Sequence, residues 1–120
     1  MMDFEKVCDE IFKIDPKVRY AAVFDYFATK VAGGMRKGVK SILPESLTKL
    51  SVDQAIIRWR SRLALEDWIG LPKYAIAEYD KIKRCIIYLN SEHLLLISTE
   101  VEMDGAKLIN NVNKILKRTV

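Results

Sequence analysis

The segment from Gly33 to Ser41 carries a near match to a motif with a known chemistry. Four residues separate Gly33 from Gly38, and Lys40 and Ser41 follow, which is close to the spacing of a phosphate-binding loop. In that motif the lysine and the hydroxyl residue directly follow the second glycine, so that backbone N–H groups surround the phosphates at a helix start. Here Val39 intervenes. The sequence therefore argues against a nucleotide-binding loop.

The same loop is basic, and its cations indicate a different kind of site. Arg36, Lys37 and Lys40 are expected at the exposed tip of a glycine-rich connection. Loops carry many binding residues, because a rigid scaffold positions them at the surface. These three side chains are therefore our candidates for contact with an anion or a partner protein, and a solvated connection without a binding role is the alternative.

Residues suited to catalysis or metal binding are few. His93 is the only histidine, and it is expected at a turn, without a serine or cysteine in a recognisable nucleophile setting. A metal bound by His93 and Cys85 would still lack its third and fourth ligands. Glu78, Asp80 and Asp25 could pair only through tertiary structure. We therefore predict no catalytic residue, no metal site and no cofactor, and expect a protein that is not an enzyme.

The run from Arg58 to Arg62 interleaves cations with an aromatic residue, as nucleic-acid-binding segments do. On a helix Arg58 and Arg62 share a face while Trp59 lies on another, so no platform for stacking bases is presented. The formal charge of +4 arises from 20 basic and 16 acidic residues spread along the chain. The sequence therefore argues against nucleic acid as a partner.

Length and composition predict a single folded domain over residues 1–120. The chain has 120 residues, 50% of them hydrophobic and 30% charged, which is ordinary for a globular protein. Its two cysteines, Cys8 and Cys85, are expected to be buried thiols in a reducing compartment. The N-terminal segment lacks the features of a signal peptide, and no apolar run is long enough to span a bilayer. We expect a cytoplasmic protein without membrane insertion.

The first part of the chain is predicted to form a helix and a hairpin. The helix ends before Pro16, because a residue that precedes proline is displaced from the helical region. Strands are expected over residues 18–25 and 28–32, and residues 33–44 are expected to be a flexible loop. Apolar residues recur at helical spacing in the first helix: Phe4, Val7, Cys8, Ile11 and Phe12.

The central helix is predicted to begin at a capping box formed by Ser51 and Gln54, in which each side chain satisfies a backbone donor. An additional turn over residues 46–50 is left open, and Gly70 ends the helix. Apolar residues occupy two sides of this helix, so two different surfaces must cover it. The main buried side contains Val52, Ala55, Ile56, Trp59 and Leu63, and the second contains Ile57, Ala64, Leu65 and Trp68.

Three consecutive strands follow, joined by tight turns. Alternation and β-branched, aromatic or apolar residues predict strands within residues 73–80, 82–89 and 93–99. A last amphipathic helix is expected over residues 104–118. The fold class is therefore α+β, with a five-stranded antiparallel sheet flanked by helices in the order α-β-β-α-β-β-β-α.

The chain resembles the roadblock, or dynein light chain, group and its profilin-like relatives. The resemblance rests on this order, on the central helix closed by Gly70, on the hairpin segment VRYAAVFDYFATKVAG and on the meander KYAIAEYDKIKRCIIYLNSEHLLLIST. The chain is also similar to small archaeal domains of unknown function. The first turn, Asp25-Tyr26-Phe27, departs from the Asp-Gly turn of roadblock hairpins. The resemblance implies a dimerising, non-enzymatic platform for signalling or trafficking partners, among them a small GTPase or its regulator.

Two functions are open on the sequence alone. The first is a protein-interaction module that forms a homodimer or binds a related roadblock-like partner through the surplus apolar residues Ile57, Leu65 and Trp68. The alternative is a sensor of profilin-like or PAS-like type, with a small anionic ligand held between the sheet and the loop of Arg36, Lys37 and Lys40.

Overall fold

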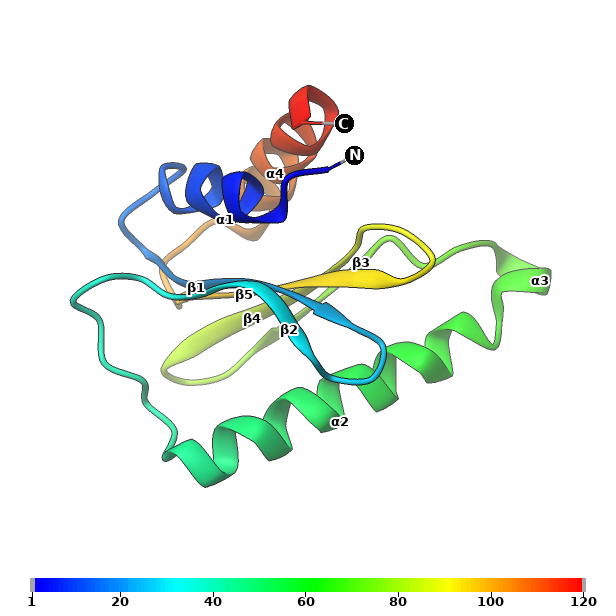
Figure 1. Ribbon diagram of the computed structural model, residues 1–120, viewed down its shortest axis with the longest axis horizontal. Helices are drawn as coiled ribbons and strands as arrows, with labels where there is room; N and C mark the ends of the chain where they lie inside the picture. The colour runs from blue at the N-terminus through cyan, green and yellow to red at the C-terminus, as the bar shows by residue number, and fades with distance from the viewer. Residues whose placement is uncertain (1, 120) are drawn as a thin grey trace.

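The computed structural model, which describes residues 2–119, has a five-stranded antiparallel sheet between two helical layers (Figure 1). Helices α1 (Phe4–Phe12) and α4 (Gly105–Thr119) cover one face of the sheet, and α2 (Glu45–Leu63) lies across the other. A short helix, α3 (Glu66–Ile69), follows α2 and extends beyond the end of the sheet. The α+β class and the order α-β-β-α-β-β-β-α are confirmed, with α3 as an addition.

Strands that are distant in sequence lie at the centre of the sheet. The order is β2-β1-β5-β4-β3, so β1 pairs with β5, and β2 and β3 form the two edges. The last three strands form the predicted meander. Their bounds and those of the hairpin are β1 (Val18–Asp25), β2 (Lys30–Met35), β3 (Tyr74–Glu78), β4 (Ile82–Tyr88) and β5 (His93–Glu100).

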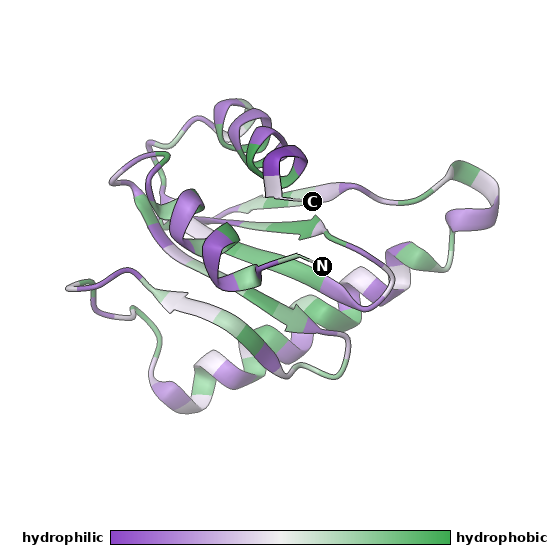
Figure 2. Ribbon diagram, turned by 45° about the horizontal axis from the view of Figure 1, so that its top comes forward, coloured by the Kyte–Doolittle hydropathy of each residue, from purple (hydrophilic) through white to green (hydrophobic). Residues whose placement is uncertain are grey.

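Each central strand contributes to two cores, because successive side chains point to opposite faces of a sheet. On β1, Ala21 and Val23 face α1 and α4, whereas Ala22 and Phe24 face α2. The ribbons of the central strands are correspondingly hydrophobic along most of their length (Figure 2). The core under α1 and α4 contains 16 buried residues and the core under α2 contains 8. The layer that contains α2 is therefore the less extensively packed one.

The two terminal helices have the bounds expected from their periodicity. Asp3 caps α1, since its side chain accepts a hydrogen bond from the backbone N–H of Lys6. Val7, Cys8 and Ile11 are buried on its inner side. Both cysteines are free and buried, as predicted. Among the residues that the structure describes, none of the helices combines the length and apolar character needed to cross a bilayer.

The predicted start of the flexible loop at residue 33 is wrong, because Gly33 and Gly34 belong to β2. The strand begins and ends later than the expected 28–32, and it pairs with β1 up to the contact of Met35 with Tyr20. Gly33 has a φ of +84°, a conformation that favours glycine. A Cβ atom there would lie 2.8 Å from the sulfur of Cys8. Gly33 therefore allows α1 to approach the sheet edge, which turn statistics do not predict.

The predicted start of the central helix at Ser51 is also wrong. Helix α2 begins at Glu45, with Pro44 at the N-cap position and the Pro44 carbonyl accepting from the N–H groups of Leu47 and Thr48. The capping box therefore lies inside the helix, where the Ser51 hydroxyl is buried and has no hydrogen-bond partner. The turn left open over residues 46–50 is helical.

The far end of the central helix differs from the prediction as well. Helix α2 ends at Leu63, and α3 forms a separate turn before Gly70, which has a φ of +92°. Gly70 thus ends a helix as predicted, although that helix is α3. Sequence periodicity missed the interruption between α2 and α3 because the intervening Ala64 and Leu65 are good helix formers.

Candidate functional site

Large apolar side chains are exposed along α2 and α3. Ile57, Leu65 and Trp68, the sequence-predicted interface residues, have exposed fractions of 63%, 52% and 79%. The opposite side of α2 carries Val52, Ile56 and Trp59, all buried against the sheet. The structure covers one apolar side of α2 and leaves Ile57 exposed on the other, whereas Leu65 and Trp68, which were predicted on that second side, lie beyond the end of α2.

The exposed residues form a longer stripe than the sequence prediction identified. Leu47 and Leu50 precede Ile57 at helical spacing on the side of α2 that faces away from the sheet, and they are 46% and 50% exposed. The prediction missed both because it placed the start of the helix after them. We call these exposed residues the outer apolar stripe. It consists of Leu47, Leu50 and Ile57 on α2 and of Leu65, Trp68 and Ile69 at and within α3.

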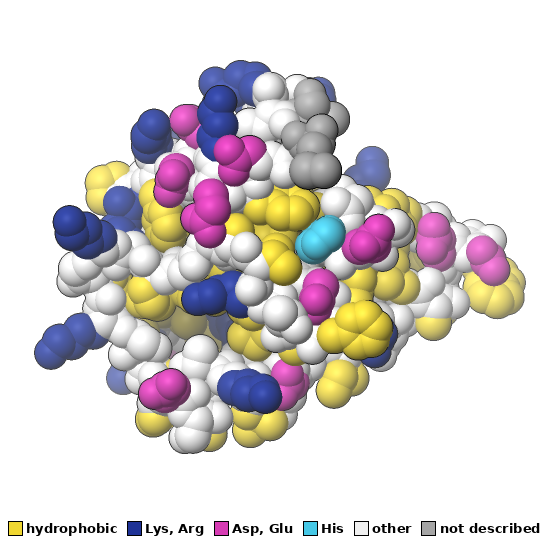
Figure 3. Space-filling view, in the orientation of Figure 1, with side chains coloured by type: hydrophobic (Ala, Val, Ile, Leu, Met, Phe, Trp, Pro, Cys, Tyr) yellow, Lys and Arg dark blue, Asp and Glu magenta, His cyan; other side chains and the backbone are white. Residues whose placement is uncertain are grey.

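Helix α3 projects from the rest of the molecule. None of its four residues is buried, and both Trp68 and Ile69 are 79% exposed. Hydrophobic side chains occupy the end of this projection, with two acidic side chains beside them (Figure 3). Leu65, Trp68 and Ile69 complete the outer apolar stripe. An indole exposed to this degree is typical of a residue that a partner covers.

The edge strand β3 offers backbone groups to a partner. It pairs with β4 in uninterrupted register from Tyr74 to Glu78, and its other side has no strand neighbour in the sheet. The opposite edge, β2, has a register irregularity against β1 and two glycines with positive φ. Regular unpaired strands accept an additional strand more readily than bulged ones, so β3 is the edge suited to sheet extension.

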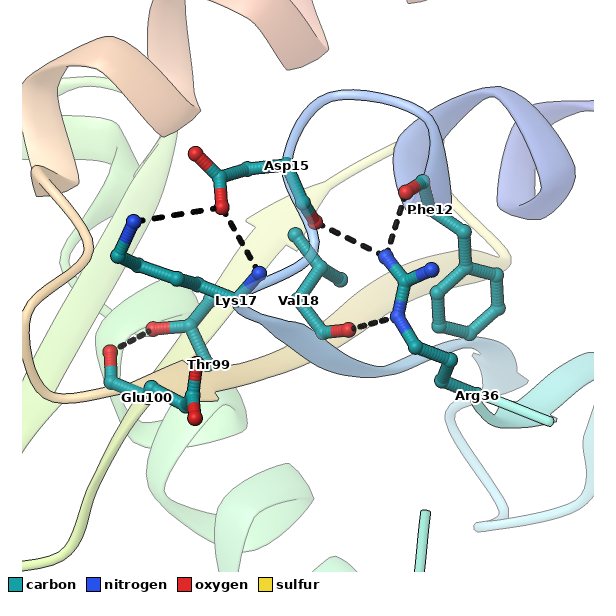
Figure 4. Close-up of polar contacts among 7 residues, drawn as sticks. All are labelled: Phe12, Asp15, Lys17, Val18, Arg36, Thr99 and Glu100. Carbon is teal, nitrogen blue, oxygen red and sulfur yellow. Dashed lines mark hydrogen bonds and ion pairs between the residues drawn. The ribbon is translucent and has the colours of Figure 1, made fainter. Parts of the chain in front are cut away.

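The structure places the three predicted loop cations in different environments. The Arg36 guanidinium donates to the backbone carbonyls of Val18, Phe12 and Asp15 at 2.7, 2.5 and 2.9 Å (Figure 4). Its charge also lies 5.2 Å from the centre of the Phe12 ring. Arg36 thus connects the end of α1 to the first hairpin, and these contacts give this side chain a structural role.

Lys37 and Lys40 are exposed at the surface of the connection between β2 and α2. The backbone carbonyl of Lys40 accepts a hydrogen bond from Arg19 at 3.0 Å, whereas the side chain of Lys40 takes part in none of the ion pairs found in the described part of the chain. Binding of an anion or a partner by Lys37 and Lys40 remains a prediction.

A groove that sequence reasoning missed lies between α2 and the sheet, and its α2 lining extends from Glu45 to Arg62. Its volume is about 620 Å³, and its lining comes from α2, from the preceding connection and from all five strands. Part of its floor is made by Ala75 and Ala77 of β3, whose small side chains leave space below the helix. The available signal was Arg84, whose place two residues before Ile86 on β4 puts a cation on the same face of the strand as an apolar residue.

The residues considered for catalysis or metal binding lie apart from one another or already contact other side chains. The His93 ring lies 4.7 Å from the Phe4 ring and its Nδ1 lies 3.1 Å from Oδ1 of Asn90. Burial raises the pKa of the Cys8 and Cys85 thiols to about 12, so neither is a ready nucleophile at neutral pH. Within residues 2–119 no group of three or more histidine, cysteine, aspartate or glutamate side chains is placed to hold a metal ion.

The chain is similar in structure to several proteins of known structure, although its sequence is not. No protein-family model and no curated protein matches the sequence. A Roadblock/LC7 domain from Streptomyces avermitilis has a TM-score of 0.73 at 13% identity, over 97% of this chain and 93% of that one. MglB in a tetrameric arrangement has a TM-score of 0.76 at 12% identity, over 95% and 82%.

Profilin II of Acanthamoeba castellanii is similar as well, with a TM-score of 0.63 at 9% identity over 97% of this chain and 95% of that one. At these identities the likeness concerns the fold. The predicted resemblance to the roadblock and profilin-like fold is confirmed.

Proposed function

We propose that this protein is a non-enzymatic interaction module that forms a homodimer or binds a partner of the same fold. The observation that carries the proposal is the outer apolar stripe, which runs along α2 and continues onto the projecting α3. Several large apolar side chains exposed on the outer side of one helix and on the turn that follows it are typical of an interaction site. The self-associated form of the similar MglB structure agrees with this proposal.

The stripe has the composition of an interface centre. Ile57, Leu65 and Trp68 carry no charge, and aromatic and aliphatic anchors of this kind contribute most of the binding energy in protein complexes. Full burial of one such side chain contributes about 1.5–3 kcal/mol. The regular edge β3 adds a second means of association, in which backbone groups of a partner strand extend the sheet.

A small GTPase or its regulator is the further partner class that the roadblock resemblance implies. Such a partner would bind a surface that dimerisation through the stripe and the sheet edge leaves free. The exposed Lys37 and Lys40 are available for a polar contact of that kind.

Light scattering across a concentration series tests self-association. The wild type is expected to be a dimer at micromolar concentration, and Trp68→Glu and Ile57→Glu are expected to be monomers, because each places a charge in the apolar contact. Asn113→Glu is the matched control, since Asn113 is exposed on α4 at the opposite face of the sheet. Circular dichroism and thermal melting verify that all variants are folded.

A wild type that stays monomeric at high micromolar concentration would contradict self-association. A dimer that persists in both Trp68→Glu and Ile57→Glu would show that the stripe is not the interface. Dissociation of Asn113→Glu together with the other two variants would show that added charge, rather than the place of the substitution, splits the dimer.

A further inference from the structure

We propose that the groove between α2 and the sheet binds a single-chain amphiphile, and that Arg84 pairs with the anionic head of this ligand. This inference concerns a different surface from the outer apolar stripe and does not depend on self-association. Arg84, the shape and lining of the groove, and the charge at its rim each support it.

Arg84 lies in the middle of the sheet without a partner for its charge. On β4 it pairs with Ala77 of β3 and Ser98 of β5, and it shares with Ile86 the face that α2 covers. It is half-buried and lines the groove. Among the described residues it forms no hydrogen bond or ion pair through its side chain. An anion that enters the groove would therefore meet a positive charge that the described part of the chain does not pair.

The neighbouring cation on the same strand, Lys83, does have partners for its charge. Lys83 faces the other side of the sheet, where its ammonium donates to the carbonyl of Met103 at 2.7 Å and lies 3.6 Å from the carboxylate of Glu78. Strand β4 therefore carries one cation that the fold itself satisfies and one, Arg84, that it does not. An anionic ligand in the groove would satisfy Arg84.

The groove has the size and the walls of a site for an apolar chain. Its volume of about 620 Å³ falls within the range of pockets that hold small molecules. The groove exists because the first turns of α2 bury nothing before Val52, while Ala75 and Ala77 below them are small. The apolar wall includes Met35, Ile42, Leu43, Val52, Ile86 and Leu96.

The charge around the groove is strongly one-sided. Six basic residues line it against a single carboxylate, that of Glu45, and no ion pair within residues 2–119 involves any of the six. Such a surface attracts anions before contact. The six are Arg19, Lys30, Lys49, Arg58, Arg62 and Arg84.

Two hydroxyl groups are available to the head as hydrogen-bond donors. Burial raises the pKa of Tyr20 to about 12, so its hydroxyl keeps its proton at neutral pH. Tyr20 pairs with Ser98 across the sheet, beside Arg84. Ser51 also lines the groove from the α2 side; its hydroxyl is buried without a partner among the described residues and would have to turn toward the groove to donate to a ligand. These donors suit a carboxylate or phosphate head.

An acyl chain fits this site better than an acidic peptide does. A peptide would bring backbone N–H and C=O groups that need partners when buried. The central strands under the groove already pair with one another on both sides, and its walls are largely apolar, so those partners are scarce. An unbranched hydrocarbon chain has no such requirement. The proposed ligand is therefore a free fatty carboxylate or alkyl phosphate.

Calorimetric titration of the full chain with decanoate and with decyl phosphate, below their micelle concentrations, tests the proposal. We expect saturable binding, and Arg84→Met is expected to weaken it about tenfold or more, as the loss of a charge-assisted contact predicts. Ala77→Trp is expected to abolish binding by filling the groove while leaving Arg84 in place. Arg118→Met, at an exposed position in the last turn of α4, is expected to bind like the wild type.

Ligands that lack one part of the amphiphile complete the design. Decanol, which has no charge, and acetate or inorganic phosphate, which have no chain, are expected to bind at least about tenfold more weakly than decanoate. Thermal melting verifies folding, and Arg84→Met without ligand is expected to melt no lower than the wild type, because an unpaired cation is removed.

Three results would overturn the proposal. The first is equal binding by Arg84→Met and the wild type. The second is binding of acetate or phosphate as tight as that of decanoate. The third is uptake by vesicles of phosphatidylcholine and phosphatidic acid without any binding of monomeric decanoate. Repeating the titration with Trp68→Glu separates the two proposals, because the groove is expected to bind decanoate whether or not that variant is a dimer.

Discussion

At the scale of single residues, Gly33 and Arg36 connect the first helix to the edge of the sheet by different means. The N–H of Gly33 donates to the Glu5 carboxylate at 3.1 Å, and the absence of a side chain leaves space for Cys8. Arg36 reaches three backbone carbonyls around the end of α1. Both residues were predicted to lie in a flexible loop, and both instead hold α1 on the hairpin.

Gly33→Ala is expected to lower the free energy of unfolding by about 3 kcal/mol or more, because strain at positive φ adds to a steric conflict. The new Cβ would lie 2.1 Å from the carbonyl oxygen of Ala21 and 2.8 Å from the Cys8 sulfur. Gly38→Ala is the matched control, since Gly38 has nearly the same φ, +83°, with no atom within 4 Å of a new Cβ. Its expected cost is about 1 kcal/mol.

Urea unfolding followed by tryptophan fluorescence measures both values, and the slope of the transition verifies that the native states are comparable. Equal costs for the two substitutions would show that the contact between α1 and the edge of β2 does not depend on the missing side chain.

At the scale of elements, α2 differs most from its sequence prediction. Its first turns extend beyond the expected capping box and remain exposed, whereas its second half packs through Ile56 and Trp59. The helix therefore leaves the sheet partly uncovered at its N-terminal end. The groove arises from this arrangement, whereas the outer apolar stripe is exposed because it lies on the side of α2 that faces away from the sheet and on α3.

Ser51→Ala distinguishes the sequence prediction from the structure. A capping serine replaced by alanine would cost about 1 kcal/mol. In the structure Ser51 lies inside α2 with a buried hydroxyl that has no partner. We therefore expect Ser51→Ala to leave stability unchanged or to raise it by up to about 1 kcal/mol, since a buried polar group without a partner is removed.

Asp3→Ala is the control for this experiment, because Asp3 does cap α1 through the N–H of Lys6 at 3.1 Å. Its expected cost is about 1 kcal/mol by urea unfolding. A loss of similar size for Ser51→Ala would contradict the position of the hydroxyl within the helix.

At the scale of the whole molecule, the two layers differ in how completely they enclose their side chains. Cys8 on α1 and Cys85 on β4 belong to the larger core, under α1 and α4. Desolvation by burial is the main cause that raises the pKa of each thiol from 9.0 to about 12, and the nearby Glu5 and Asp9 add to the effect at Cys8. The thiols therefore report on opening of this core.

Both thiols are expected to resist an aromatic disulfide reagent at pH 8, and to react only as fast as the native state opens. Addition of urea should accelerate labelling in proportion to the unfolded population. Cys8→Ser and Cys85→Ser assign the two rates. Reaction of either thiol within the mixing time in native buffer would contradict its burial.

The same groups give stability a dependence on alkaline pH. The unfolded thiols ionise near pH 9 and the folded ones near pH 12, so the native state binds more protons between these values. Stability from the thiols is fully present below about pH 9 and is lost as pH rises toward 12, by up to about 1.4 kcal/mol per thiol and pH unit.

What the sequence by itself determined are the features that repeat over short distances. The periodicity of α1 and α4, the alternation in β3, the β-branched and apolar density of β4 and β5 and the order of the elements follow from residues near one another in the chain, so local spacing and composition predict them. The exposure of Ile57 on α2 was predictable for the same reason, since one helix cannot turn two apolar sides toward a single sheet. The placement of Leu65 and Trp68 beyond the end of α2 was not predictable in this way.

Only the tertiary structure decided the features that depend on contacts between distant segments. The strand position of Gly33 requires glycine because α1 passes beside it. Arg36 forms hydrogen bonds because the end of α1 brings a backbone carbonyl within reach of its guanidinium. The groove requires the first turns of α2, the small residues of β3 and the cation of β4 to meet. No local pattern encodes such a meeting, because the sheet joins strands that the sequence separates by many residues.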